Sequence, residues 1–392
     1  MMEAVTDLLR PFVGYIPASK FGRRIVGPPS ATLTNEQRET TMGDPLSFRK
    51  SAGRNAACSA DEAKKWISER LKHGELLPTD RAAVVVYRQE AGDFVAQGII
   101  ADLSLDGYQS GRVKRHEKTI AKTQQKMAEY MRATRVYGNP PVTAIGPKPG
   151  AEGAIAGLVG GTPDSTFTTV DGIRHQMWMV VGDAADGLCR QVDTDLYITD
   201  GHHRLAAAAL AASIEDRPDA RIPVGVFSAS EFRLRSFARC ISDPELDLPA
   251  ATTRLQNEFE LEEVGFGEAL LPRTRFEFGA KIGRRYFRLR IPQDRVPDDH
   301  YSSLNTNLIQ ALVLGPVFGI THPRLDKRLR FVAHLDDSYE ACPDADAWFL
   351  PFPLEVSDVM AVANSDRTMP AKSTWFTPKL PSGLVIRALD QE

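Results

Sequence analysis

The segment of the sequence that says most about the fold is Leu196-Tyr197-Ile198-Thr199-Asp200-Gly201-His202-His203-Arg204-Leu205-Ala206-Ala207-Ala208. The apolar and β-branched residues of 195–199 predict a strand, and the alanine-rich segment 205–213 predicts a helix. Gly201, at the corner between them, allows a positive φ or a close approach of the backbone to a ligand. A strand that leads through a glycine turn into a helix indicates an α/β (α+β) fold with an anion-binding site at the helix start.

The residues of this turn suit a phosphate group. The first amides of a helix have no partner within the helix and carry partial positive charge. Arg204 adds a planar fork of donors, and the two histidines are further donors at short range. Asp200 is placed to hold Mg²⁺, which usually takes one or two carboxylates together with phosphate oxygens. We therefore predict a metal at Asp200 and a nucleotide phosphate bound by Gly201, His202, His203 and Arg204.

Two simpler interpretations of the turn remain open. Asp200 could do no more than cap the helix, although a cap does not require glycine, two histidines and arginine in succession. His202 and His203 could instead bind zinc. Adjacent histidines on one turn point in different directions, however, and no cysteine or third histidine close in the sequence completes a ligand set.

Composition restricts the class of protein further. The chain has 392 residues, 42% hydrophobic and 25% charged, with a net charge of −3, so no overall basic field points to nucleic acid. Its four cysteines form no CxxC pair and are interpreted as reduced thiols: Cys58, Cys189, Cys240 and Cys342. We find no signal-peptide pattern and no apolar run long enough for a membrane span, so we expect a cytoplasmic protein.

The remaining pattern predicts three parts. Residues 1–60 are expected to form an irregular N-terminal segment, 61–245 a nucleotide-binding domain and 246–392 a C-terminal α+β domain. The Gly- and Pro-rich segment 138–166 is expected to be a loop with one short element, a candidate lid or added subdomain. Strands are predicted at 82–87, 94–103, 175–182, 221–228, 276–278, 286–291 and 348–352, and helices at 59–77, 117–134 and 356–364.

A second segment of interest contains Glu117. This glutamate lies where the loop Val113-Lys114-Arg115-His116 enters the helix predicted over 117–134. A carboxylate in this position can act as a base or hold a metal. Taken alone, Glu117 is better interpreted as a first-turn residue that the helix dipole stabilises.

A third segment lies near the C-terminus, where Met369-Pro370-Ala371-Lys372-Ser373-Thr374-Trp375-Phe376-Thr377-Pro378-Lys379-Leu380 holds a polar centre between two prolines. An ammonium and two hydroxyls on a rigid loop suit a small charged ligand. Taken alone, the segment is at least as well interpreted as an ordered loop packed by its two aromatic residues.

These three segments, in this order, resemble the motifs of the free serine kinase family and its uncharacterised bacterial relatives of unknown function. The matches are His116-Glu117-Lys118-Thr119 (HE-x-T), Asp200 to Arg204 (DGHHR) and Met369 to Lys379 (MP-x-KST-x-F-x-PK). The DGHHR turn also resembles the phosphate loop of the ParB/sulfiredoxin-like fold, in which a Gly-x-x-Arg turn opens a helix. The resemblance implies a ParB/sulfiredoxin-like nucleotide-binding core with a second, C-terminal α+β region that contributes the Lys-Ser-Thr loop.

The resemblance also implies a role for each matching residue. Glu117 would be the catalytic base, and Asp200 and His202 would complete the catalytic group. The phosphate-binding turn would comprise Gly201, His202, His203 and Arg204. The substrate-binding group would comprise His116, Lys372, Ser373 and Thr374. The implied cofactors are Mg²⁺ and ATP or ADP, and the implied reaction is phosphoryl transfer to a small hydroxy amino acid, with free serine the leading candidate.

One departure from the family pattern affects the substrate. Archaeal serine kinases carry arginine and histidine after the Lys-hydroxyl-hydroxyl motif, where they help to hold the amino acid, whereas this chain has Trp375 and Phe376. The partner of an amino-acid carboxylate is therefore not identified by the resemblance.

Two other functions fit the same turn. The chain could be a ParB-like switch that binds and slowly hydrolyses a nucleotide, although its acidic balance and the lack of a helix-turn-helix pattern count against a DNA partner. It could also be a nucleotide or metabolite sensor without catalytic activity. Serine-dependent turnover, serine-independent hydrolysis and binding without turnover distinguish the three.

Overall fold

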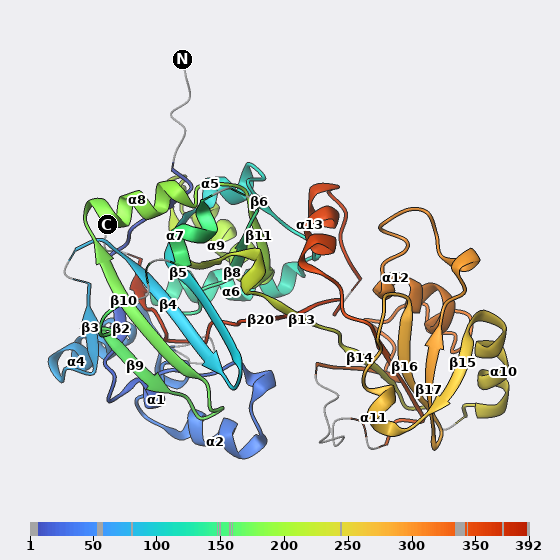
Figure 1. Cartoon of the computed structure of the whole chain (residues 1–392). Helices are drawn as coiled ribbons and strands as arrows, with labels where there is room; N and C mark the ends of the chain where they lie inside the picture. The colour runs from blue at the N-terminus through green and yellow to red at the C-terminus, as the bar shows by residue number, and fades with distance from the viewer. Residues whose placement is uncertain are drawn as a thin grey trace. The chain divides into compact units, whose positions relative to one another are not determined.

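The structure, a computed structural model, describes residues 7–52, 58–79, 81–146, 148, 150–156, 158, 160–243, 245–333, 342, 344–370 and 372–389. Contacts divide the chain into two compact units, one of Met1–Phe232 with Pro378–Glu392 and one of Arg233–Thr377 (Figure 1). The expected boundary near residue 245 lies inside the second unit, and the end of the chain returns to the first. The combination of mixed sheets and helices confirms the α/β (α+β) class.

A nine-stranded mixed sheet forms the centre of the first unit. Its order is β6-β11-β8-β12-β5-β4-β10-β9, and β1 pairs with β5. β4, β5 and β10 pair antiparallel, whereas β12 is parallel to β8 and β11 is parallel to β6. The strands are β1 (Leu9–Arg10), β4 (Ala83–Ala91), β5 (Phe94–Ser104), β6 (Val113–Lys114), β8 (Val142–Ile145), β9 (Ser165–Thr168), β10 (Arg174–Val181), β11 (Leu196–Asp200) and β12 (Arg221–Phe227). Two short pairs join β2 (Tyr15–Pro17) to β3 (Leu76–Pro78) and β7 (Val136–Tyr137) to β21 (Arg387–Ala388).

Strand β8 corrects the expectation for the segment 138–166. All four of its residues are buried, and it lies between β11 and β12 in the sheet. The segment also contains α7 (Ala151–Ala156) and β9, so it is not a loop with one short element. Four apolar or small residues after Pro140-Pro141 are too few to show a period, and only the pairing with distant strands makes them a strand.

The helices of the first unit follow local signals only in part. Ser59 and Glu62 form the capping box that opens α4, as their spacing predicts, but the helix ends at Lys72 and residues 76–78 form β3 instead. The described residues between 7 and 60 are not an irregular segment, because α1–α3 lie among them. The helices are α1 (Gly22–Ile25), α2 (Asn35–Gly43), α3 (Phe48–Ser51), α4 (Ala60–Lys72), α5 (Leu105–Gln109), α6 (Ala121–Thr134), α7, α8 (Asp183–Gln191) and α9 (His202–Ile214).

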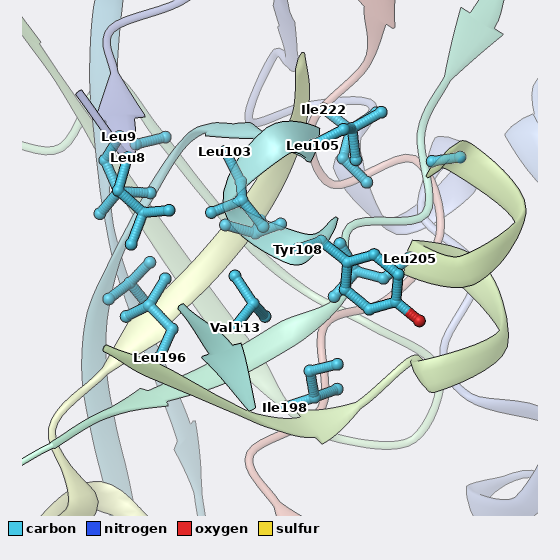
Figure 2. Close-up of a cluster of buried hydrophobic side chains, with 14 of the residues drawn as sticks. Leu8, Leu9, Leu103, Leu105, Tyr108, Val113, Leu196, Ile198, Leu205 and Ile222 are labelled. Carbon is cyan, nitrogen blue, oxygen red and sulfur yellow. The ribbon is translucent and has the colours of Figure 1, made fainter. Parts of the chain in front are cut away.

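A buried apolar cluster anchors the turn between β11 and α9 (Figure 2). Leu196 and Ile198 of β11, Val113 of β6 and Leu205 of α9 are all buried in this cluster. Burying one such side chain contributes about 1.5–3 kcal/mol. The strand end and the first helical turn are therefore held in place by the core, while the polar residues between them are left to form a site.

The second unit contains a six-stranded sheet in the order β15-β17-β16-β19-β14-β18 and a separate pair, β13 with β20. The strands are β13 (Arg233–Arg235), β14 (Ala238–Ile241), β15 (Glu260–Val264), β16 (Glu277–Ile282), β17 (Arg285–Arg290), β18 (Leu329–Val332), β19 (Ala347–Pro351) and β20 (Trp375–Thr377). The helices are α10 (Leu248–Glu258), α11 (Phe266–Ala269), α12 (Asn305–Ile309) and α13 (Val356–Asn364). Throughout the described parts of both units, no helix combines the length and the apolar character needed to cross a membrane.

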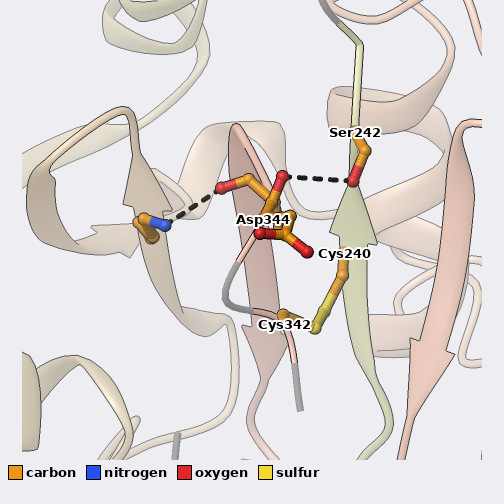
Figure 3. Close-up of a disulfide and its surroundings, with 6 residues drawn as sticks. Cys240, Ser242, Cys342 and Asp344 are labelled. Atoms are coloured by element: carbon orange, nitrogen blue, oxygen red, sulfur yellow. Dashed lines mark hydrogen bonds between the residues drawn. A yellow bond between two sulfur atoms is a disulfide. The ribbon is translucent and has the colours of Figure 1, made fainter. Parts of the chain in front are cut away.

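A disulfide in the second unit corrects the expectation of four reduced thiols. Cys240 of β14 bonds to Cys342, which precedes β19 (Figure 3). The two cysteines are 102 residues apart in the chain, and their Cα atoms are 6.4 Å apart. Pairing of β14 with β19 brings the two cysteines together. No short sequence motif could therefore predict the disulfide. Cys58 and Cys189 remain free thiols.

Candidate functional site

The candidate site lies in the first unit, at the corner between β11 and α9. Gly201 has a φ of 99° and is the N-cap residue of α9, and no side chain of the described residues caps the helix. Hydrogen bonding within the helix begins at the backbone N–H groups of Arg204 and Leu205, which both donate to the carbonyl of Gly201. The interpretation of Asp200 as a helix cap is therefore wrong. The positive end of the helix dipole therefore has no side-chain cap among the described residues.

Only glycine fits at the corner. A Cβ at position 201 would lie 2.9 Å from Nε of Arg204 and 2.9 Å from Cβ of Pro141, in addition to the unfavourable φ. The glycine thus keeps the backbone, Arg204 and the loop before β8 in close contact.

Replacing Gly201 by alanine should lower the free energy of unfolding by about 1–2 kcal/mol or more, because the new Cβ is strained by φ and by both contacts. Chemical denaturation measures the change. Gly187→Ala in α8 is the matched control, since a Cβ there meets no atom within 4 Å. It should leave stability unchanged or raise it by up to about 1 kcal/mol. Equal stability of the two variants would show that the corner tolerates a side chain.

Asp200 forms ion pairs with two cationic side chains. Its Oδ1 accepts a hydrogen bond from Nζ of Lys379 at 2.7 Å, and its Oδ2 pairs with Nη2 of Arg204. Burial alone would raise the pKa of Asp200, but Lys379 and Arg204 outweigh burial and hold this pKa well below its ordinary value. Sequence reasoning did not select Lys379 as a site residue, although it ends the third motif and could have been found there.

Arg204 is engaged with protein groups. Its Nη1 donates to the carbonyls of Asn139 at 3.0 Å and Pro140 at 2.7 Å, while Nη2 reaches Asp200. The guanidinium therefore fastens the loop before β8 to the end of β11. This differs from the expectation of a fork held open for phosphate, and it makes Arg204 a fixed positive charge beside the helix end.

Magnesium does not fit Asp200 as the residue is arranged here. Both of its carboxylate oxygens already accept from cations, and these cations repel a divalent ion. In the part of the chain that is described, no three His, Cys, Asp or Glu side chains gather as a ligand set. We therefore assign Asp200 the task of holding Arg204 and Lys379, and derive no step through a metal.

The loop before α6 brings Glu117 to the start of α9. Nε2 of His202 accepts from the N–H of His116 at 3.5 Å, and Nδ1 of His203 accepts from the N–H of Ile120 at 3.4 Å. The two histidines therefore bind both ends of the loop that carries Glu117. Oε2 of Glu117 lies 3.8 Å from Nδ1 of His202, and its side chain is 31% exposed. Glu117 precedes α6 and does not belong to its first turn.

The hydrogen bonds also settle how His202 is protonated. Because Nε2 accepts, the ring proton lies on Nδ1, which faces Glu117. His202 and His116 are buried, with ring centroids 4.4 Å apart. Burial lowers the pKa of His116 to about 3 and that of His202 well below its ordinary value. Both rings are neutral at pH 7 and support the loop, which differs from the expected contacts of His116 with substrate and of His202 with phosphate.

Acid should destabilise the first unit through these histidines. A group whose folded-state pKa is depressed favours unfolding once the pH falls below its unfolded pKa, about 6.5 for histidine. Between pH 6.5 and 5, His116 alone should cost at most about 2 kcal/mol of the free energy of unfolding. His116→Gln should therefore lose less stability than the wild type over this range in chemical denaturation.

The matched control for that pH series is His73→Gln, the same change at an exposed histidine at the end of α4. It should follow the wild-type pH dependence. If His116→Gln did so too, the buried imidazole would not be the source of the acid sensitivity.

The Lys-Ser-Thr part of the third motif lies in the second unit. Ser373 is buried, and its Oγ donates to the carbonyl of Pro370 at 2.7 Å. Lys372 has a φ of 55°, is exposed, and holds its Nζ 5.2 Å from the ring centroid of Phe237. Thr374 is partly buried beside them. The hydroxyl of Ser373 thus closes its own turn, whereas Lys372 remains accessible to solvent.

Fold and site together define an α/β protein in which a helix start without a side-chain cap among the described residues lies beside a partly exposed carboxylate. The chain belongs to the family described as "Protein of unknown function (DUF1015)", which matches residues 9–313. No curated protein matches the chain.

Solved structures similar to this chain include a C-terminally truncated SbnI from Staphylococcus aureus. It has 11% identity and a TM-score of 0.40, and the match covers 72% of this chain and 87% of that one. A free serine kinase in complex with AMP has 16% identity and a TM-score of 0.37, with 72% and 91% covered. A conserved hypothetical protein from Pyrococcus furiosus has 15% identity and a TM-score of 0.37, with 74% and 96% covered.

Proposed function

We propose that this protein binds a nucleotide by its phosphates at the start of α9 and transfers a phosphoryl group to the hydroxyl of a small amino acid, with free serine the leading acceptor. The observation that carries the proposal is the partly exposed carboxylate of Glu117, on a loop whose backbone His202 and His203 bind beside a helix end that no side chain of the described residues caps. A proton acceptor and an anion-binding end are thus adjacent in one unit.

Charge at the corner supports phosphate binding. The helix end carries partial positive charge, and the cations Arg204 and Lys379 flank it while sharing one counter-ion, Asp200. A nucleotide phosphate is attracted to this positive charge. Because Asp200 and the carbonyls of Asn139 and Pro140 fix Arg204 in advance, little ordering is needed when the phosphate arrives.

In the proposed reaction, the substrate hydroxyl oxygen forms a bond to the terminal phosphorus as the bond to the leaving nucleotide oxygen breaks. Glu117 accepts the hydroxyl proton. Phosphoryl transfer depends mainly on positioning and on neutralising charge, which the helix end and the two cations supply. The likeness of the three motifs to the free serine kinase family supports serine as acceptor, and ATP or ADP as donor.

The test is incubation of the full chain with ATP, ADP or CTP and free serine, with and without Mg²⁺, followed by mass spectrometry for O-phosphoserine. Phosphoserine that depends on both substrates supports the proposal. Nucleotide hydrolysis at a rate that does not depend on serine indicates a ParB-like switch. Nucleotide binding without turnover indicates a sensor. Absence of nucleotide binding in calorimetry overturns all three.

A further inference from the structure

A buried arginine in the second unit has no acidic partner among the described residues. Arg239 lies in β14, between Phe331 of β18 and Phe349 of β19, and is 1% exposed. Burial lowers its pKa to about 10, and no described charge offsets that effect, so the side chain is still charged at pH 7. A charge removed from water is normally paired, which makes an arginine in this state unusual.

The guanidinium group of Arg239 is only partly bonded. Its Nη1 donates to the carbonyl of Phe237 at 2.6 Å, the one hydrogen bond that this side chain makes to a described residue. Its Cζ lies 5.7 Å from the ring centroid of Phe331, a contact that attracts the cation but accepts none of its remaining N–H groups in the plane of the fork. Nε and Nη2 form the other edge of the group, and neither is among the unpaired side-chain atoms that lie out of reach of solvent. This edge is therefore available to an acceptor.

A second cation lies beside the same phenylalanine. Lys372 is exposed, holds its Nζ 5.2 Å from the ring centroid of Phe237, and pairs with no described acidic residue. The ring of Trp375 meets that of Phe237 edge-on, with centroids 5.6 Å apart. Phe237 thus has an exposed ammonium at its ring and a buried guanidinium at its carbonyl. The two cations make the start of β14 positive.

We propose that the start of β14 binds the carboxylate group of a small molecule, with Arg239 as its bidentate partner and Lys372 as a second positive charge. The edge formed by Nε and Nη2 presents two parallel N–H groups that match the two oxygens of a carboxylate. A singly charged carboxylate suits this site better than a phosphate dianion, because the cost of removing an ion from water rises steeply with its charge. The proposal concerns the second unit alone and does not depend on the function proposed above.

The probe is acetate, with acetamide as a neutral molecule of the same shape. Each is titrated into the full chain at constant ionic strength and followed by ligand-observed NMR. Acetate should bind, and acetamide should bind at least about tenfold more weakly. Lys372→Gln should weaken acetate binding by about threefold, since an exposed charge is screened by salt.

Two substitutions at Arg239 test its part in the site. Arg239→Met should weaken acetate binding on the order of a hundredfold, about tenfold for each of the two lost charge-assisted bonds. Arg239→Lys keeps the charge without the fork and should weaken binding by about tenfold. Arg330→Met, at an exposed arginine of β18, is the matched control and should bind acetate as the wild type does.

Stability distinguishes a ligand site from a structural arginine. In a buffer without carboxylates, Arg239→Met should raise the denaturant concentration at the midpoint of unfolding, because methionine fills the space without the cost of a buried charge. The proposal is overturned if the wild type binds no acetate, if acetamide binds as tightly as acetate, or if Arg239→Met binds acetate as Arg330→Met does. A lower midpoint for Arg239→Met also overturns it, since the arginine would then serve the fold.

Discussion

Glu117→Gln should lower turnover by about 10²–10⁴-fold and leave nucleotide affinity unchanged. Glutamine preserves the size of the side chain and removes its ability to take a proton. The phosphates are proposed to bind at the start of α9, to which Glu117 does not belong. The affinity for the nucleotide should therefore be unaffected by the substitution. Steady-state kinetics for turnover and calorimetry for affinity measure the two effects separately.

Glu129→Gln is the matched control for this experiment, because Glu129 is an exposed glutamate on the helix that follows the same loop. It should leave both turnover and affinity as in the wild type. Full activity of Glu117→Gln would remove Glu117 from the role of base. A loss of affinity without a loss of turnover would instead make it a binding residue.

Asp200→Asn should lower the free energy of unfolding by about 3 kcal/mol, at the low end of the range for breaking a buried ion pair. The reason is that it leaves two cations, Lys379 and Arg204, without their shared counter-ion; the Asp200 side chain is 27% exposed, which moderates the loss. Since the folded-state pKa of Asp200 is depressed, its contribution is present above about pH 4 and is lost as the pH falls further.

A double-mutant cycle with Lys379→Met tests the pair directly. The double variant should lose less than the sum of the single losses, because either single change already removes the Lys379–Asp200 contact. Asp7→Asn serves as control: its pair with Arg10 has side chains 64% and 51% exposed at 3.7 Å, and such pairs contribute at most about 1 kcal/mol. Additive losses for Asp200 and Lys379 would show that their contact does not stabilise the unit.

Features with local causes could be predicted from the sequence. The corner at Gly201 could be found because the mostly apolar segment 196–199 favours a strand and the alanine-rich segment after the glycine favours a helix, so the chain must turn between them. The capping box of Ser59 and Glu62 could be found because its two partners are three residues apart. In both cases the residues responsible are close together in the sequence.

Features that depend on distant partners could not be predicted. The contact of Lys379 with Asp200 joins residues 179 positions apart, and it changes Asp200 from a metal ligand into a counter-ion. Strand β8 exists because β11 and β12 pair with it. The orientation of the His202 ring depends on the contact of the loop 115–120 with the start of α9. The residue spacing within the DGHHR motif does not predict that contact.

The pairing of β13 with β20 has a practical consequence. Arg233, where the chain enters the second unit, is the direct partner of Thr377, where it leaves. Entry and exit are therefore neighbours, and the 233–377 segment is a cassette inserted at one point of an otherwise continuous chain. Genetic excision at this point, with a short turn joining 232 to 378, is a direct way to obtain the first unit alone, and the same junction is the natural place to exchange the second unit between homologous chains.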